Sequence, residues 1–258
     1  QRRAVRIAAA ARDVDPAARV AELRLDILQL VADDRRHPLR LRQDVDQVDD
    51  LLRRERNIEI KIKIILGSTR QSRFSEKPAQ WIFEEAKKLE GVDVELLDLR
   101  DYPMPFFDDS MSPSMAKGQY SNAVVKKWAA KINDGDAFII VSPEYNHGYP
   151  AVLKNALDVI YPEWNKKPVG FVSYGSALGA RSVEQFRQVA VELQMAPIRN
   201  AIHIPVDIFF AAMMGKGPTG PEMFKPIRES MMGDRVQIFF DDLLWWAKAL
   251  KAARENLK

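Results

Sequence analysis

The chain has 258 residues, with 39 basic and 36 acidic side chains, a formal net charge of +3 and no cysteine. The balanced charge gives no indication of a nucleic-acid partner, and the lack of cysteine excludes disulfides, a thiol nucleophile and cysteine-based metal sites. The apolar runs fall short of the roughly 20 residues of a membrane helix, and no secretory signal is visible, so we expect a cytoplasmic protein with no membrane partner.

Residues 1–57 differ in composition from the rest of the chain. They contain thirteen Arg and nine Asp but no Lys, Gly or aromatic residue. Helical spacing at Leu23, Ile27 and Leu30, with Pro38 as a break further on, predicts two helices or a partly ordered tail. Because acidic residues cancel most of the Arg charge, we expect a solvated extension rather than an arm for a partner or nucleic acid. Upstream or out-of-frame translation of GC-rich DNA is a third interpretation.

Residues 58–258 alternate between strand and helix patterns and are expected to form one domain. The expected strands are Ile58–Leu66, Val92–Leu99, Ala137–Val141, Val169–Tyr174 and Ile198–Val206. One expected helix begins in the loop after the first strand and ends at about Leu89, and another begins in the loop after the fourth strand and ends at about Met195. The other expected helices are Tyr120–Ile132, Pro150–Ile160 and Arg235–Glu255. Five strands alternating with helices predict an α/β fold, in which a doubly wound parallel sheet has helices on both faces.

A glycine-containing loop, Gly67–Arg73, follows the first expected strand and opens a helix. Such a loop offers unpaired N–H groups and the positive end of a helix dipole to an anion. Ser68 adds a hydroxyl, while Arg70 and Arg73 add charge and bidentate geometry. The loop lacks the Lys-Ser/Thr ending of a nucleoside triphosphate loop and the third glycine of a dinucleotide fingerprint, so a terminal monophosphate is the expected ligand. The alternative is structural: the glycine turns the chain, and Ser68 or Ser75 caps the helix.

A second loop, Pro143–Pro150, follows the third expected strand and contains two prolines, two tyrosines, an asparagine and a histidine. The prolines fix the backbone and Gly148 lets it turn, and a stiff ledge with aromatic faces can pack against a planar heterocycle. A third loop, Ser173–Arg181, could complete the opposite edge, where its glycines allow close backbone approach. All three loops are expected at the carboxyl ends of parallel strands, where open α/β sheets bind ligands.

Histidine and acidic residues give little sign of side-chain catalysis. No paired carboxylate or nucleophile accompanies His147, so we expect no strict catalytic residue, and His147 is the candidate if an acid–base role exists. His203 lies in an expected strand and is interpreted as a core or interface residue. With His37 in the extension, the three scattered histidines predict no metal site.

From about Ile58 onward the chain resembles the NADPH-dependent FMN reductase family, a branch of the flavodoxin-like proteins. The resemblance is carried by Gly67-Ser68-Thr69-Arg70 with Arg73, and by Pro143–Pro150 leading into Leu153-Lys154-Asn155-Ala156-Leu157-Asp158. The second motif is specific, whereas the first alone is not, and residues 1–57 have no counterpart in the family pattern. The resemblance implies a flavodoxin-like, five-stranded doubly wound sheet, preceded by a helical or disordered extension.

The resemblance also implies non-covalent FMN as cofactor and NADPH as hydride donor. It assigns the phosphate to Ser68, Arg70, Arg73 and Ser75, and the flavin ring to Pro143, Glu144, Tyr145 and Asn146, with Ser173 and Gly175 on the far side. Hydride would pass through FMN to a small acceptor, such as a flavin, quinone, azo compound or metal oxyanion, in a ping-pong exchange carried by the cofactor. Relatives form oligomers, which implies a homodimer or homotetramer. The segment Pro205–Pro221 is expected to shape the acceptor pocket or a subunit contact.

Two other functions remain open from the sequence. One is a flavodoxin-type electron carrier that never meets NADPH. The arginines of the first loop and the near-neutral charge of residues 58–258 favour the reductase over such a carrier. The other is a non-catalytic flavodoxin-fold binding protein, against which the presence of both ligand loops argues.

Overall fold

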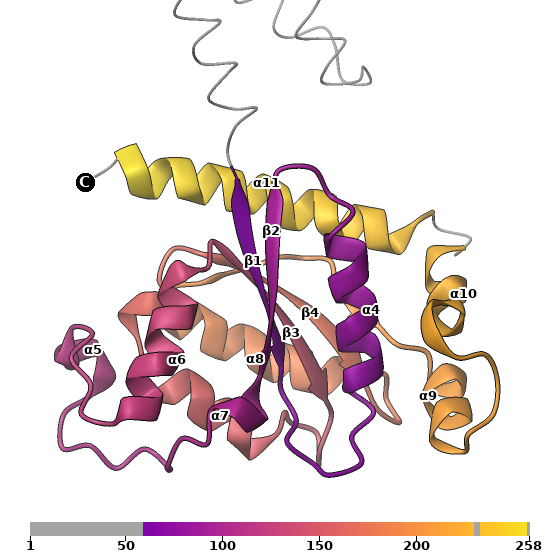
Figure 1. Cartoon of the computed structure of the whole chain (residues 1–258), viewed down its shortest axis with the longest axis horizontal. Coiled ribbons are helices and arrows are strands. Elements are labelled where there is room, and N and C mark those ends of the chain that lie inside the picture. The colour runs from indigo at the N-terminus through magenta and orange to yellow at the C-terminus, as the bar shows by residue number, and fades with distance from the viewer. Residues whose placement is uncertain (1–58, 230–232, 257–258) are drawn as a thin grey trace, which may run out of the picture. The chain divides into compact units, whose positions relative to one another are not determined.

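The computed structural model describes residues 59–229 and 233–256, and the helices expected within residues 1–57 lie outside the described part. One sheet contains β1 (Ile60–Leu66), β2 (Val92–Asp98), β3 (Ala137–Pro143), β4 (Pro168–Tyr174), β5 (Ala196–Pro197) and β6 (Ile202–His203) (Figure 1). All strand pairs are parallel, in the order β2-β1-β3-β4-β5, and β6 also pairs with β4. This order, with helices on both faces, confirms the flavodoxin-like doubly wound fold.

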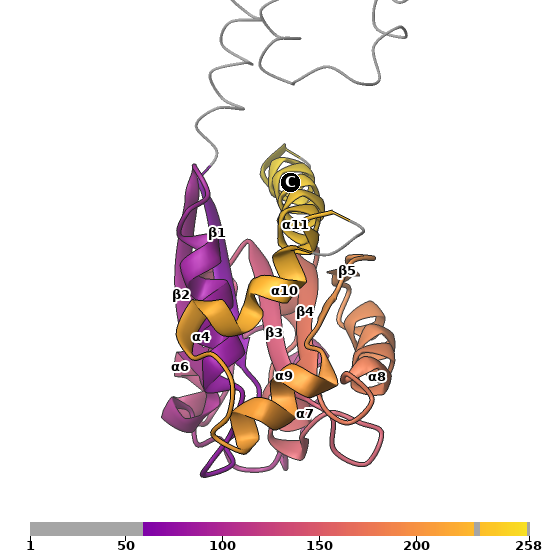
Figure 2. The same cartoon turned by 90° about the vertical axis from the view of Figure 1, so that its right-hand side faces the viewer.

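Helices cover the two faces of the sheet. The described helices are α4 (Glu76–Ala86), α5 (Pro113–Ala116), α6 (Ala123–Asp134), α7 (Ala151–Asp158), α8 (Ala180–Glu192), α9 (Val206–Met213), α10 (Lys225–Arg228) and α11 (Arg235–Asn256). Three short 3₁₀ turns are η1 (Leu99–Asp101), η2 (Pro162–Trp164) and η3 (Gly220–Phe224). Helices α4 and α11 pack on one face, and α6, α7 and α8 pack on the other (Figures 1 and 2). Among the described helices, none is both long and apolar enough to cross a membrane.

The fifth expected strand, Ile198–Val206, is wrong as a single element. The structure instead has β5 just before this range and β6 within it, two residues each, and both pair with β4. Between them the chain leaves the sheet, because the side chain of Arg187 on α8 donates to the carbonyl oxygens of Ile198 (2.7 Å) and Arg199 (3.0 Å). The backbone N–H of Asn200 (3.5 Å) and its side-chain amide (3.1 Å) likewise donate to Asp242 on α11. Side chains from two helices therefore interrupt the ladder that the apolar pattern had predicted.

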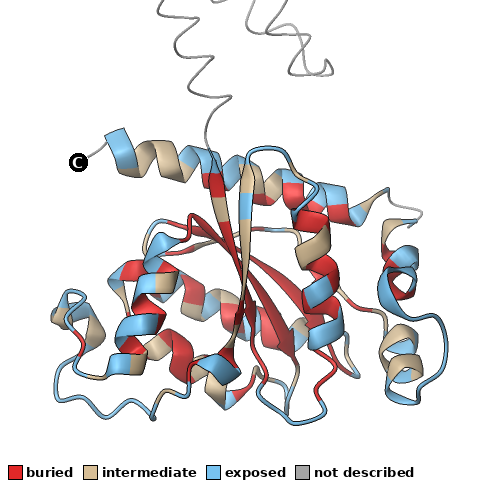
Figure 3. Ribbon diagram, in the orientation of Figure 1, coloured by how far each residue is buried: buried red, intermediate tan, exposed pale blue. Residues whose placement is uncertain are grey.

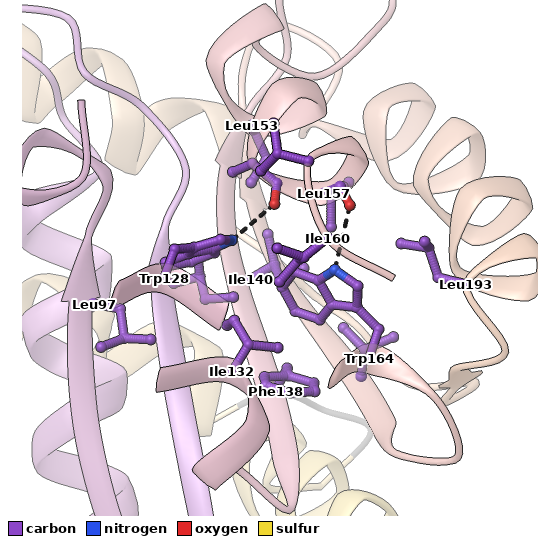
Figure 4. Close-up of a cluster of buried hydrophobic side chains, with 14 of the residues drawn as sticks. Leu97, Trp128, Ile132, Phe138, Ile140, Leu153, Leu157, Ile160, Trp164 and Leu193 are labelled. Atoms are coloured by element: carbon purple, nitrogen blue, oxygen red, sulfur yellow. Dashed lines mark hydrogen bonds between the residues drawn. The ribbon is translucent and has the colours of Figure 1, made fainter. Parts of the chain in front are cut away.

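The core lies on both sides of β3 and β4, whose residues are all buried (Figure 3). Strands covered on both faces carry nearly continuous apolar runs, as these two do. Between the sheet and α6, α7 and α8, the indole N–H of Trp128 donates to the carbonyl oxygen of Ala156 (2.8 Å), and that of Trp164 donates to Leu157 (3.3 Å) (Figure 4). These bonds avoid the cost of about 1–3 kcal/mol for a buried donor left unpaired.

Candidate functional site

The carboxyl ends of β1, β3 and β4 lie side by side because the strands pair in parallel register. Leu66 pairs with Val141, and Pro143 pairs with Tyr174. The loops that leave these strands border a small, open cleft of about 180 Å³. The cleft is lined by Arg70, Ser72, Arg73, Phe74, Pro143, Glu144, Tyr145, Tyr174, Gly175, Ser176, Phe209 and Met213. The three loops predicted to share one crevice therefore meet at one edge of the sheet.

Gly67 starts the first loop close to β3 and α7. Its N–H donates to the carbonyl oxygen of Val141 (2.9 Å). A Cβ atom at residue 67 would lie 2.7 Å from Cδ2 of Leu153 and 3.0 Å from that same carbonyl oxygen. Any other residue would therefore require the Leu153 side chain to move and the loop to shift slightly from β3. Close approach, rather than a left-handed backbone, explains the glycine.

The first loop turns its carbonyl oxygens toward two guanidinium groups. Arg73 donates to the carbonyl oxygen of Ser68 (2.5 Å). Arg100, from η1, donates to the carbonyl oxygens of Arg70 (2.5 Å) and Gln71 (3.0 Å). Within the described residues, no hydrogen-bond acceptor is found for the backbone N–H groups of Ser68, Thr69, Gln71 and Ser72. Free N–H groups just before the amino end of α4 make this loop suitable for an anion such as phosphate.

Arg73, which the sequence assigned to the phosphate, is largely engaged by the protein. Its Nε donates to Glu76 (3.0 Å), its Nη1 donates to Asp98 (2.7 Å), and its Nη2 donates to the second oxygen of Asp98. Together with the bond to Ser68, these contacts use four of the five guanidinium N–H groups. The side chain is 2% exposed. We therefore interpret Arg73 mainly as the residue that holds the loop in shape at the cleft wall.

Arg70 is the cation of this loop that stays available. Its exposed side chain has no hydrogen bond or ion pair with any of the described residues, and it lines the cleft. Its neighbours Arg73 and Arg100 are both paired with carboxylates, so their charges are largely neutralised. An anion in the cleft would therefore meet Arg70 as its main charged partner.

The two serines assigned to the phosphate are buried and pair with tyrosines. The Ser68 hydroxyl lies 3.1 Å from the Tyr145 hydroxyl, a hydrogen bond that joins the first and second loops. Ser75 occupies the N-cap position of α4 but makes no side-chain cap bond, and its hydroxyl accepts from Tyr174 (2.8 Å). Burial raises the pKa of Tyr174, so this phenol stays protonated as the donor. Neither serine lines the cleft itself. Each instead forms a hydrogen bond with a tyrosine that does: Ser68 with Tyr145, and Ser75 with Tyr174.

The second loop makes a tight turn at Asn146 and His147, whose φ angles are +49° and +71°. Tyr145 N–H donates to the carbonyl oxygen of Gly148 (2.8 Å), and Gly148 N–H donates back to Tyr145 (3.0 Å). Two left-handed residues inside such a pair of bonds form a type I′ turn. Asn and His adopt this backbone more readily than most residues. The turn therefore depends on Asn146 and His147, not on Gly148 as the sequence had suggested.

Glu144 is fixed by an ion pair across the cleft edge. Its carboxylate accepts from Arg181 Nε (2.6 Å) and from the Arg181 backbone N–H (3.2 Å), and it forms an ion pair with Arg181 Nη2. The side chain of Glu144 is 4% exposed, and its own N–H donates to Tyr174 (3.0 Å). Glu144 therefore locks the second loop to the start of α8, and its carboxylate is not free for another partner.

Ser173 and Gly175, both assigned to the far side of the ring, lie at different depths. Gly175 lines the cleft, whereas Ser173 is fully buried beneath it. The Ser173 hydroxyl donates to the carbonyl oxygen of Leu178 (2.9 Å) and lies 2.8 Å from Nδ1 of His203. Because a hydroxyl has a single proton, we assign the proton of the second bond to the imidazole. Burial lowers the pKa of His203, so the ring is a neutral, hydrogen-bonded support.

The two histidines of the described residues lie in different parts of the fold. His147 is exposed on its turn, His203 lies beneath the third loop, and His37 falls outside the described residues. Over residues 59–229 and 233–256, no three His, Asp or Glu side chains gather so that they could hold a metal ion.

Four residues that shape the cleft were missed by sequence reasoning. Asp98 ends β2 and Arg100 follows it, and their position at the end of a strand neighbouring β1 could have identified them. Phe209 and Met213 come from α9 and form an apolar wall, in which Phe209 lies 5.2 Å from Phe74 between ring centroids. Both lie inside Pro205–Pro221, but nothing in that segment's pattern singled them out.

The parallel sheet and the cleft at its carboxyl edge define a flavodoxin-like α/β protein. In agreement, the crystal structure of RosB with bound 8-demethyl-8-formylriboflavin-5′-phosphate has a similar fold, with a TM-score of 0.52 and 13% identity over 75% of this chain and 81% of that chain. The chain is 40% identical over 149 residues to NAD(P)H-dependent FMN reductase C4B3.06c of Schizosaccharomyces pombe, covering 57% of this chain and 74% of that protein. It is 30% identical over 211 residues to NAD(P)H-dependent FMN reductase ntnL of Nectria sp, covering 77% of this chain and 97% of that protein.

Residues 60–207 match the family model of NADPH-dependent FMN reductase, and the chain belongs to this family. It is an NAD(P)H-dependent flavoenzyme, for which FMN and NADPH are the expected cofactors. The cleft fits FMN because Arg70 and Ser72, from the loop with free N–H groups, line it together with the flat or apolar residues Pro143, Tyr145 and Phe209. A phosphorylated planar molecule needs both features.

Proposed function

We propose that this protein passes hydride from NADPH to a small acceptor in a ping-pong exchange, with both substrates using the open part of the cleft in turn. FMN, when bound, supplies the hydride chemistry. The observation that carries the proposal is the combination in one cleft of a loop with unpaired N–H groups, the available cation Arg70 and aromatic walls.

The ten residues that the sequence assigned to FMN divide into two groups in this proposal. Contacts to FMN come from the first loop's N–H groups, Arg70, Pro143, Tyr145, Asn146 and Gly175. Support comes from residues whose polar groups are engaged by the protein: Ser68, Arg73, Ser75, Glu144 and Ser173. The first group determines affinity directly, and the second determines the shape of the loops.

No side chain of the cleft is proposed as a strict acid or base. Glu144 is the one acidic residue that lines the cleft as described, and Arg181 occupies its carboxylate. His147 lies on the exposed turn and does not line the cleft. Since the chain's task is binding and orientation, protons would be exchanged with solvent at the open face.

Apolar, planar acceptors fit the cleft best, because Phe74, Tyr174, Phe209 and Met213 form one side of it. Relatives named as an NAD(P)H:quinone oxidoreductase from Solanum tuberosum and an FMN-dependent NADPH-azoreductase from Staphylococcus saprophyticus support this choice. We propose a quinone as the preferred acceptor class.

A homodimer or homotetramer and a cytoplasmic location also belong to this proposal. Large apolar side chains are exposed in the loop before α5, on α9 and on α11, among them Phe106, Phe210 and Trp245. Such surfaces are often subunit contacts. Light scattering of the purified protein tests the oligomeric state, and cell fractionation tests the location.

The function is tested by adding FMN to the purified chain, removing the excess and recording the visible flavin spectrum. NADPH is then added without oxygen, followed by 1,4-naphthoquinone. We expect the flavin bands to bleach with NADPH and to return with the quinone. Retained FMN that NADPH does not bleach would instead indicate an electron carrier, and no retained FMN would contradict the site.

A further inference from the structure

Arg100 lies outside the first loop but contacts three of its carbonyl groups. It belongs to η1, directly after β2, and is about thirty positions along the chain from the loop. Its guanidinium donates to the carbonyl oxygens of Thr69 (3.4 Å), Arg70 (2.5 Å) and Gln71 (3.0 Å). Arg73 takes the preceding carbonyl, that of Ser68. Four consecutive carbonyl groups are therefore drawn toward guanidinium groups.

This arrangement decides which backbone groups the loop can offer to a ligand. A loop whose carbonyl oxygens faced the cleft would repel an anion, because those oxygens carry partial negative charge. Here the oxygens have cationic partners, while N–H groups of the loop, such as those of Gln71 and Ser72, lack acceptors within the described residues. Concave sets of free N–H groups are the backbone form of an anion site.

Two carboxylates hold the arginines in place. Glu76 Oε1 accepts from Arg73 (3.0 Å) and from Arg100 (3.1 Å). Asp98 accepts from Arg73 and from the backbone N–H of Arg100 (2.9 Å). Two cations thus face two anions, so the group carries no net charge. Its effect on a bound phosphate comes from geometry, whereas the effect of Arg70 comes from charge.

We propose that Arg100 is a positioning residue, which sets the direction of the first loop's peptide groups so that their N–H groups receive the FMN phosphate. The inference rests on the proposed function of this loop as the phosphate site. It assigns to η1 a role in cofactor affinity without contact with the cofactor.

The test compares FMN with riboflavin, which has the same ring but no phosphate. Arg100→Gln should weaken FMN binding about tenfold or more, the scale of one lost charge-assisted hydrogen bond. Riboflavin affinity should stay unchanged, and the ³¹P resonance of bound FMN should shift. Arg100→Lys should recover part of the FMN affinity, because one ammonium can reach some of the carbonyl oxygens but lacks the planar fork.

Arg254→Gln is the matched control. Arg254 also joins a carbonyl oxygen, that of Lys166 (2.7 Å), to a carboxylate, that of Asp136 (2.8 Å), but at a distance from the cleft. Its loss should lower stability without changing the FMN-to-riboflavin affinity ratio.

The proposal is overturned if Arg100→Gln binds FMN as the wild type does, or if FMN and riboflavin affinity fall together. A second readout is the effect of salt on FMN affinity. Replacing Arg100 and Glu76 together by Gln leaves Arg73 paired with Asp98 and the group without net charge, so this double variant should leave the salt dependence nearly unchanged, whereas loss of Arg70 should reduce it. Wild-type protein that binds riboflavin as tightly as FMN would contradict the proposed phosphate site itself, which separates the two failures.

Discussion

The guanidinium of Arg73 and the carboxylate of Asp98 are joined by two hydrogen bonds, which tie the loop after β1 to the end of β2. Burial raises the pKa of Asp98, but the hydrogen bond and charge of Arg73 outweigh it, so the pKa lies below the ordinary value. The same contacts raise the pKa of Arg73 against the effect of its own burial. The pair is therefore charged at neutral pH, and the phosphate loop depends on it.

Replacing Asp98 with Asn should destabilise the fold in a pH-dependent way. At pH 7 we expect the free energy of unfolding to fall by about 1–3 kcal/mol, since Arg73 loses a charged hydrogen-bond partner. Because the folded-state pKa of Asp98 is lowered, its stabilisation is present above its ordinary value of 3.8 and is lost as pH falls through the folded-state pKa. Urea unfolding at several pH values should show the wild type and variant converging in acid. Asp109→Asn, in an exposed loop, is the control and should show no such convergence.

Replacing Arg70 with Gln should weaken FMN binding without affecting the fold. We expect a loss of about ten- to hundredfold in FMN affinity, typical of a charge-assisted contact to phosphate, and little change in riboflavin affinity or unfolding. Flavin fluorescence titrations measure both affinities. Lys77→Gln removes the same charge from the exposed first turn of α4 without touching the cleft lining. An equal loss in both variants would indicate a long-range charge effect and contradict a direct contact.

The strand and helix order could be predicted from the apolar pattern, because β1 alternates and then becomes continuously apolar, and β3 and β4 carry apolar runs. The break within Ile198–Val206 could not be predicted, since it depends on bonds from its backbone to the side chains of Arg187 on α8 and of Asp242, 42 positions away on α11. The loops of the site could also be located, because they follow strands. The roles within them could not: whether an Arg such as Arg73 faces a ligand or a carboxylate depends on the end of β2, about 25 positions away.

Replacing Gly179 with Ala should lower the free energy of unfolding by more than backbone strain in the third loop alone would. Gly179 has φ +73°, and a Cβ there would lie 2.6 Å from the Ser173 Cβ and 2.7 Å from the Tyr174 nitrogen. Gly215 has a similar φ of +66° but open space around its Cβ position. Gly215→Ala should therefore cost about 1–2 kcal/mol from the left-handed backbone, and Gly179→Ala should cost about 1–3 kcal/mol more from overpacking. Equal unfolding free energies for the two variants would show that the loop relaxes around the added methyl.

Replacing Met213 with Ala should change acceptor preference. Met213 lines the cleft and is 50% exposed, whereas its neighbour Met214 is 65% exposed and does not line it. Losing this apolar wall should lower kcat/KM for 1,4-naphthoquinone about three- to tenfold, as expected from about 1 kcal/mol of apolar contact. The rate with ferricyanide, a small hydrophilic anion, should stay constant. Met214→Ala should alter neither, and a parallel drop with both acceptors would point to a defect in FMN or NADPH binding instead.

Because of Lys167, the free energy of unfolding should rise with pH. Burial lowers the pKa of Lys167 to about 7, with a smaller contribution from Arg254. Its two hydrogen bonds, to the carbonyl oxygens of Ile132 and Asn133 (2.9 Å each), match the two N–H groups of a neutral amine. Since the unfolded chain keeps the ordinary value of 10.5, it binds an extra proton between about pH 7 and 10.5, and the free energy of unfolding rises across that window. Lys167→Met should flatten this rise in urea unfolding at pH 7, 8 and 9. A slope unchanged by the substitution would mean that Lys167 stays charged in the folded protein.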